Sequence, residues 1–219
     1  MTKIDIFSGF LGAGKTTLIK KLIAEAYSGE KLVLIENEFG EINIDGGFLK
    51  ESGIEISEMS AGCICCSLVG DFNKALKEVV AQFHPDRILI EPSGVGKLSD
   101  VIVAVERTVD ECPGELKLNS YVTVADASKV KVYMKNFGEF YNNQIEAAGT
   151  IILSRTQKLS QEKLEAAAAA VCAMGLAGEI GWSRMAEGDG NSTYRNRIID
   201  AIYNMDGATL NGGAKYELR

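Results

Sequence analysis

A complete phosphate-binding loop motif, G-x-x-x-x-G-K-[ST], occupies residues 9–17 of the chain, with the sequence GFLGAGKTT. The apolar run at residues 4–7 predicts a strand before the motif, and apolar residues at helical spacing over residues 18–26 predict a helix after it. A strand, a glycine-rich loop and a helix in this order are the context in which the motif binds phosphate. The start of the chain therefore predicts a nucleotide-binding α/β fold.

The residue types of this loop match its expected chemistry. Glycines adopt backbone conformations that bulkier residues do not, so successive N–H groups can turn inward around a polyphosphate at the helix N-terminus. We expect the Lys15 ammonium to lie on the outer phosphates and the Thr16 hydroxyl to bind Mg²⁺. A glycine-rich turn that binds nothing is the alternative, and the flanking strand and helix argue against it. The residues predicted to bind the phosphates are Gly9, Gly12, Ala13, Gly14, Lys15, Thr16 and Thr17.

Length and composition predict one nucleotide-binding domain over residues 1–206, followed by a loose tail over residues 207–219. A chain of 219 residues with 46% hydrophobic residues can bury one large core. The net charge of −7, without a long basic block, argues against nucleic acid or an anionic membrane surface as the partner. The chain has no apolar stretch long enough to span a bilayer and no room for a signal peptide, so we expect a cytoplasmic protein.

Strand and helix signals alternate along the chain. Apolar β-branched runs that alternate with helices predict an α/β fold, a P-loop three-layer sandwich in which helices cover both faces of a mostly parallel sheet. Further strands are expected at residues 31–36, 54–59, 87–91, 120–125 and 150–153, and helices at residues 68–83, 101–109, 161–174 and 196–204.

The carboxyl ends of such strands are where ligands gather, because the loops meet there. Glu91 ends a buried strand, so its carboxylate is predicted to reach Mg²⁺ through water or to orient the attacking water. A capping or salt-bridge role for Glu91 is the alternative. Gly94, three residues later, is predicted to present its N–H to the γ-phosphate. Lys15, Glu91 and Gly94 are thus the candidate catalytic residues.

Cys63, Cys65 and Cys66 stand almost side by side in the sequence. Thiolates are soft donors that suit Zn²⁺, Co²⁺ or Cu⁺, and this run supplies two or three ligands of a tetrahedral site. The incomplete ligand shell suits metal transfer, with a remaining ligand from a carboxylate, water or a client protein. Packed cysteines, a redox pair such as Cys63 with Cys66, and an iron–sulfur site remain alternatives.

Five segments together resemble the CobW-type GTPases, which are relatives of the hydrogenase and urease nickel-insertion GTPases. These segments are residues 9–17, IENEFGEINID (35–45), GCICC (62–66), IEPSG (90–94) and YVTVADA (121–127). The resemblance implies a P-loop GTPase that acts as a metallochaperone or metal-insertion factor for zinc, cobalt or a related ion. It implies a client metalloprotein, and a homodimer across the nucleotide face is common in this class.

The same resemblance implies roles for individual residues. The Cys-x-Cys-Cys run corresponds to the transition-metal site of the family, with Glu36 and Glu41 as carboxylate neighbours. The resemblance also places five residues in the family's first switch loop, namely Glu36, Glu38, Gly40, Glu41 and Asp45, and we expect the triphosphate to order residues 37–50. Thr16 would hold Mg²⁺.

The chain departs from the family at the base-recognition motif. Where GTPases carry Asn-Lys-x-Asp, this chain has Ser154-Arg155-Thr156-Gln157. Gln157 replaces the aspartate that binds guanine, and loss of that charge-assisted pair of hydrogen bonds is worth about 1.5 to 3 kcal/mol, or one to two decades of selectivity. Arg155 can still lay its planar guanidinium on a base. Ser154, Arg155 and Gln157 are therefore candidate base-pocket residues for GTP or ATP.

These observations lead to a hypothesis of a metal-handling switch. The triphosphate and Mg²⁺ would order the switch loop, which would hold the adjoining thiolates in a binding geometry, and hydrolysis would release the metal. An ATP-dependent activase or kinase-like enzyme, and a redox-sensing module that uses the three cysteines, are the alternatives.

Overall fold

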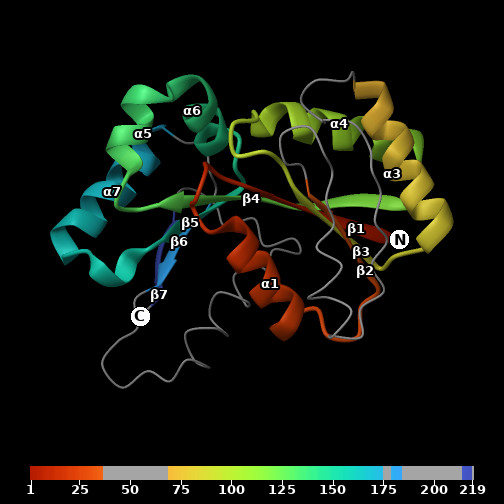
Figure 1. The fold of residues 1–219 in the computed structure, drawn as a ribbon, viewed down its shortest axis with the longest axis horizontal. Helices are drawn as coiled ribbons and strands as arrows, with labels where there is room; N and C mark the ends of the chain where they lie inside the picture. Colours follow the sequence, from red (N-terminus) through yellow and green to blue (C-terminus); the bar gives the residue numbers. More distant parts are fainter. Residues whose placement is uncertain (37–68, 175–178, 184–213, 219) are drawn as a thin grey trace.

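The computed structural model describes residues 1–36, 69–174, 179–183 and 214–218. Within these residues the chain forms one sheet of parallel strands in the order β2-β3-β1-β4-β5-β6-β7 (Figure 1). The strands are β1 (Thr2–Ser8), β2 (Leu32–Glu36), β3 (Arg87–Glu91), β4 (Leu116–Asp126), β5 (Thr150–Ser154), β6 (Glu179–Ser183) and β7 (Ala214–Leu218). The helices are α1 (Lys15–Glu25), α3 (Val69–Phe83), α4 (Leu98–Glu111), α5 (Val130–Asn136), α6 (Gly138–Glu146) and α7 (Gln161–Met174), with a short 3-10 helix at Thr156–Lys158.

Helices cover both faces of the sheet, and residues that alternate along the strands explain why. In β2, Leu32 and Leu34 pack in the cluster that contains the apolar face of α1, whereas Val33 and Ile35 pack in the cluster on the opposite face. That opposite face is covered by α3, α4, α6 and α7 (Figure 1). Because both faces are buried, β2, β3 and β5 contain continuous apolar runs, as the sequence indicates. The predicted fold class is confirmed.

Most predicted elements are present with small shifts at their ends. The strand Arg87–Glu91 and the helix Gln161–Met174 have the predicted bounds, while α4 is longer at both ends than predicted. Helices α5 and α6 have no counterpart among the elements predicted from the sequence. The strand expected at residues 54–59 and the helix expected at residues 196–204 lie outside the described residues.

The predicted loose tail differs from the structure in one part. The predicted tail spans residues 207–219, but Ala214–Leu218 within it forms β7 and pairs in parallel with β6. Alternation in Ala-Lys-Tyr-Glu-Leu is compatible with an edge strand, and the glycines at 212 and 213 before it obscured that signal. The division into a domain over residues 1–206 and a tail therefore stays a prediction except for this strand.

Candidate nucleotide site at the carboxyl edge of the sheet

The glycine-rich loop leaves the end of β1 and enters α1, as predicted. Gly14 is the N-cap of α1, and Gly9, Gly12 and Gly14 all have positive φ values. Gly9 is required by a close approach as well, since a Cβ at this position would lie 2.3 Å from the Val124 carbonyl oxygen. The loop therefore runs directly against β4, and its backbone is held around the start of the helix.

A charged and hydroxyl-bearing cluster forms where α1 begins. The Thr16 Oγ1 donates a hydrogen bond to the Glu91 carboxylate and lies 3.0 Å from each of its oxygens. The Lys15 Nζ lies 3.7 Å from Glu91 Oε1, and Lys15 is buried although Thr16 is exposed. Hydroxyl and carboxylate oxygens are the hard donors that Mg²⁺ prefers, so Thr16 and Glu91 fit a magnesium ion bound with triphosphate.

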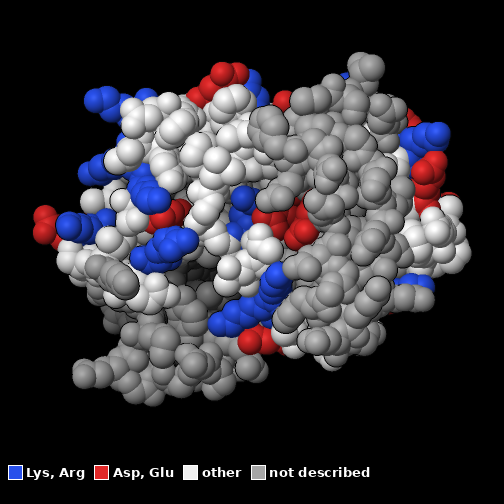
Figure 2. Space-filling model, viewed as in Figure 1, with Lys and Arg blue, Asp and Glu red and all other residues white. Residues whose placement is uncertain are grey.

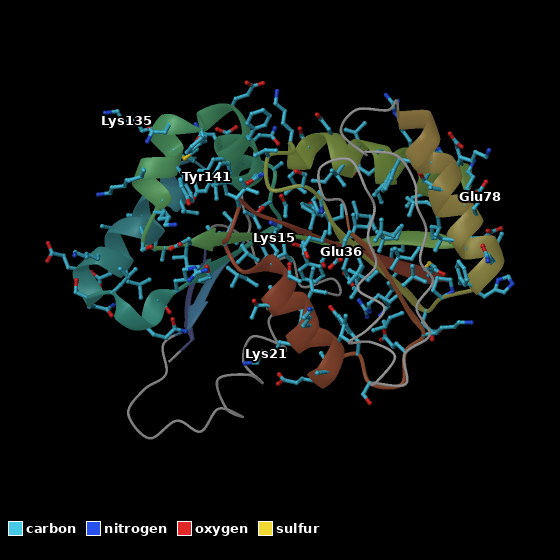
Figure 3. All side chains as sticks on the ribbon, in the orientation of Figure 1. Lys15, Lys21, Glu36, Glu78, Lys135 and Tyr141 are labelled. Carbon is cyan, nitrogen blue, oxygen red and sulfur yellow. The ribbon has the colours of Figure 1, made fainter. Side chains whose placement is uncertain are left out.

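Glu36 lies beside this cluster. It ends β2 and is paired in register with Glu91 at the end of β3. Both carboxylates therefore stand at the carboxyl edge of neighbouring strands, and Figure 3 shows Lys15 and Glu36 in this part of the molecule. The structure thus brings the predicted catalytic pair Lys15 and Glu91 close to one predicted carboxylate neighbour of the metal site.

The loop after β3 also contacts the glycine-rich loop. A Cβ at Gly94 would lie 2.9 Å from both the Leu11 backbone nitrogen and the Leu11 Cδ2. Only glycine permits this distance, because a real Cβ does not come so close to backbone. Gly94 is therefore next to the phosphate-binding loop, and its contact with a γ-phosphate stays a prediction.

The predicted base loop makes two contacts with the same backbone. The Ser154 Oγ donates to the Ala13 carbonyl at 2.7 Å, and the Arg155 Nη2 donates to the Gly12 carbonyl at 2.9 Å. The Arg155 Nε also lies 3.4 Å from Asp126 Oδ2. Arg155 has a φ of 56°, a left-handed value that aims its side chain back at the loop. Gln157 lies in the 3-10 helix and is exposed.

An aromatic cluster supports the glycine-rich loop from the side of α5 and α6. The ring centroid of Phe10 lies 4.7 Å from that of Tyr133, 4.9 Å from that of Phe137 and 6.1 Å from that of Tyr141. Burial raises the pKa of the Tyr141 phenol, and the charge of Asp126 raises it further, so this phenol stays neutral. This aromatic support is not among the sequence predictions, because α5 and α6 carry no clear helix signal in the sequence.

A separate open groove of about 650 Å³ lies between α5, α6 and α7. Lysine side chains gather over this end of the molecule in Figure 2. The groove is lined by Lys131, Met134, Lys135, Asn142, Glu146, Ala170 and Met174. None of these residues belongs to the phosphate-binding cluster, so we do not include the groove in the candidate site.

Most of the chain matches a known protein family. The family model described as "CobW/HypB/UreG, nucleotide-binding domain" matches residues 3–178. The chain belongs to the CobW/HypB/UreG family. The curated relatives of this family member include the zinc chaperone YeiR of Escherichia coli (strain K12), which is 32% identical over 166 residues, and the zinc chaperone CobW of a Sinorhizobium species, which is 31% identical over 189 residues.

The chain spans about half the length of these curated relatives. The YeiR match covers 76% of this chain and 50% of YeiR, and the CobW match covers 74% and 52%. Two solved structures support the fold of this CobW/HypB/UreG member. The Zn(II)-bound YjiA GTPase of E. coli has a TM-score of 0.59 at 21% identity, covering 94% of this chain and 62% of that one. The hydrogenase maturation factor HypB of Archaeoglobus fulgidus has a TM-score of 0.59 at 17% identity, covering 93% and 90%.

Several predicted site residues of this CobW/HypB/UreG member lie outside the described residues, namely Glu41, Cys63, Cys65 and Cys66. Within the described residues no three His, Cys, Asp or Glu side chains are grouped to hold a metal ion. The same part of the chain contains no helix with the length and apolar character needed to cross a membrane. The sulfur site therefore stays a prediction from the sequence.

Proposed function

We propose that this chain binds a purine nucleoside triphosphate, preferably GTP, together with Mg²⁺, and hydrolyses it to control a zinc site at Cys63, Cys65 and Cys66. The observation that carries the nucleotide part is the cluster at the start of α1. There a buried Lys15 and an exposed Thr16 both lie beside the Glu91 carboxylate, at the helix end that attracts phosphate.

Each residue of this cluster has a role in the proposed hydrolysis. Thr16 and Glu91 would hold Mg²⁺, which when bound neutralises charge on the outer phosphate oxygens. The Lys15 ammonium binds the same phosphates, and Glu91 orients the attacking water. The Gly94 N–H contacts the γ-phosphate from the loop that touches Leu11. Because no arginine finger is found among the predicted residues, we expect slow turnover without a partner.

Zinc is the metal that we propose as cargo, since curated relatives are named zinc chaperones. The three cysteines lie in sequence between Glu36 and Glu91, which are neighbours at the carboxyl edge. We propose that a γ-phosphate orders the switch loop and thereby sets the geometry of the three thiolates, which follow that loop in the sequence. Glu36 and Glu41 would be the carboxylate neighbours of this site. Co²⁺ is the second candidate, because a thiolate site binds both ions.

Zinc affinity in two nucleotide states tests the coupling. We expect Zn²⁺ to bind about tenfold more tightly with a non-hydrolysable triphosphate than with a diphosphate, which corresponds to about 1.4 kcal/mol of coupling. The variant in which Cys63, Cys65 and Cys66 are all changed to serine should lose this binding, while Cys112→Ser, outside the motif, should keep it. Equal affinities in both states contradict the coupling, and unchanged capture by the triple variant contradicts the sulfur site.

The base preference is tested by competition. GTP and ATP are compared as competitors of a fluorescent triphosphate, first with the natural chain and then with Gln157→Asp. An aspartate at this position would restore a charge-assisted pair of hydrogen bonds, so we expect the GTP preference to rise about ten- to a hundredfold. A natural chain that prefers ATP would favour the activase or kinase-like alternative.

The partner that we propose is a client metalloprotein that receives the zinc ion in the cytoplasm. A homodimer across the nucleotide face is the assembly that we propose. Sedimentation with a diphosphate and with a non-hydrolysable triphosphate tests this assembly, and a monomer in both states would contradict it.

A further inference from the structure

Helix α6 holds the loop between β3 and α4 through one buried side chain. The Gln144 Nε2 donates to the Gly94 carbonyl at 3.0 Å and to the Gly96 carbonyl at 2.8 Å. Gln144 is completely buried, with an exposed fraction of 0%. A primary amide nitrogen has two N–H groups, and here both are used on the loop that contains the predicted γ-phosphate contact.

The backbone around Gln144 is itself fixed. The Thr123 Oγ1 donates to the Gln144 carbonyl at 2.6 Å and thus joins α6 to the central strand β4. The adjacent Asn143 accepts from the Ser99 N–H at 3.2 Å and donates to the Ser99 Oγ at 2.9 Å. Hydrogen bonds from α6 therefore hold the loop between β3 and α4 at Gly94, at Gly96 and at the start of α4.

The same helix is also connected to the glycine-rich loop. Tyr141 is one turn before Gln144 and contributes its ring to the cluster around Phe10. Gly94 in turn is packed against Leu11, the next residue of the glycine-rich loop. Helix α6 thus contacts both segments that would surround the outer phosphates.

The side-chain oxygen of Gln144, Oε1, is buried without a hydrogen-bond donor among the described residues. A buried unsatisfied amide oxygen is costly, and a leucine or methionine would fill the same space without that cost. The two donated bonds to the loop are therefore what the glutamine contributes.

We propose that Gln144 is a positioning residue for nucleotide hydrolysis, which holds the turn from Gly94 to Gly96 so that the Gly94 N–H faces the γ-phosphate. This inference rests on the nucleotide function proposed above. In the proposed binding mode the glycine-rich loop and α1 would hold the phosphates of a diphosphate, which would lack the γ-phosphate that faces Gly94. Loss of Gln144 should then affect the triphosphate and the reaction, and should leave diphosphate binding intact.

Gln144→Leu tests this role, with Thr123→Val as the matched control, since it removes the neighbouring hydrogen bond to the backbone of Gln144 and keeps the side-chain amide. For Gln144→Leu we expect the preference for a non-hydrolysable triphosphate over a diphosphate and kcat each to fall about tenfold, the size that loss of one or two hydrogen bonds gives. The diphosphate Kd should change less than about twofold. Thr123→Val should keep both the preference and kcat.

Three results would overturn the inference. The first is an unchanged preference and kcat in Gln144→Leu, and the second is an equal loss in Thr123→Val, which would indicate general support by the helix. If Gln144→Leu does not fold, Gln144→Asn is used, because its shorter amide cannot reach both carbonyls. The third result is a Gln144→Asn variant that prefers the triphosphate over the diphosphate as strongly as the natural chain does. The natural chain is measured first, so failure to prefer a triphosphate there would reject the proposed function and this inference together.

Discussion

Buried charges occur toward both ends of the parallel sheet, but the two groups are built differently. Toward the amino ends, Arg87 is 3% exposed and donates to Asp5, which is 0% exposed. It also donates to both oxygens of Glu30, at 2.6 and 3.2 Å, and lies over the Tyr27 ring. Asp5 accepts further bonds through its other oxygen from Ser120 at 2.6 Å and Asn119 at 2.7 Å. We call this group the Arg87 network.

At the carboxyl edge the charges lie beside exposed groups. Lys15 is 3.7 Å from Glu91, and the third member, Thr16, is exposed to solvent. Phosphate oxygens could replace the contact of Lys15, and Mg²⁺ could replace the contacts of Thr16 and Glu91, because these are the ligand types that phosphate and Mg²⁺ take. Each group contains a buried cation beside a carboxylate, and from this comparison we predict that the Arg87 network contributes to stability, whereas the cluster at α1 has the binding role proposed above.

The largest expected effect is on the Arg87 network. Arg87→Met leaves the Asp5 carboxylate buried without its cation, so the free energy of unfolding should fall by about 3 to 5 kcal/mol. Urea unfolding measures this loss, and Arg107→Met, an exposed position on α4, should change stability by less than about 0.5 kcal/mol. A loss below about 1 kcal/mol for Arg87→Met would contradict a structural role.

The pH dependence of that network follows from Arg87. Burial lowers the pKa of Arg87, but the hydrogen bond that Arg87 donates to Glu30 and the charge of Asp5 outweigh burial and raise it. A raised pKa means that the contribution is complete below the unfolded pKa of arginine and is lost only as the pH rises through the folded value. The difference between Arg87→Met and the natural chain should therefore stay constant from neutral to mildly alkaline pH.

At the carboxyl edge we expect a substitution to change nucleotide affinity much more than stability. Thr16→Ala removes a proposed Mg²⁺ ligand from an exposed position, so stability should change by less than about 0.5 kcal/mol. Triphosphate affinity in the presence of Mg²⁺ should fall about ten- to a hundredfold, and chelation of Mg²⁺ should abolish the difference between the variant and the natural chain. Full Mg²⁺-dependent affinity in Thr16→Ala would contradict the assignment of Thr16.

The local part of this comparison could be predicted from sequence. The phosphate-binding loop is one continuous segment of the sequence. Glu91 is the last residue of an apolar strand, and in a parallel sheet the last residues of all strands lie at the carboxyl edge. The structure places Lys15 and Thr16 beside Glu91, and Gly94 against Leu11 of the glycine-rich loop, while the roles of these residues stay predictions. The loop residues follow from types at fixed spacing, and Glu91, although 75 residues from Thr16, follows from the rule that parallel strands end at the same edge.

The non-local part could not be predicted. Asp5 and Arg87 are 82 residues apart, and nothing in either strand's pattern identifies the other as its partner. Gln144 was missed for a related reason, because its helix was not found. Val130–Asn136 alternates apolar and polar residues like a strand, Gly138 follows directly, and neither α5 nor α6 has a side-chain hydrogen bond at its N-cap.

The smallest effect on stability is expected for an ion pair on the surface. This pair tests whether burial is the reason that the Arg87 network contributes so much to stability. Lys77 on α3 and Glu111 on α4 form an ion pair with side chains 41% and 53% exposed. Their hydrogen bond lowers the pKa of Glu111 and raises the pKa of Lys77. Lys77→Met should therefore shift the urea midpoint much less than Arg87→Met, and high salt should remove most of the shift.

The sign of the pH dependence makes this last test specific. The lowered pKa of Glu111 gives stability that is present above its unfolded pKa and is lost as the pH falls through the folded value. The raised pKa of Lys77 gives stability that is present below its unfolded pKa and is lost as the pH rises through the folded value. The effect of Lys77→Met should thus be confined to the range between these two pKa values. A salt-resistant loss as large as that of Arg87→Met would mean that burial does not separate structural charge pairs from the others, and the contrast between the two ends of the sheet would need another cause.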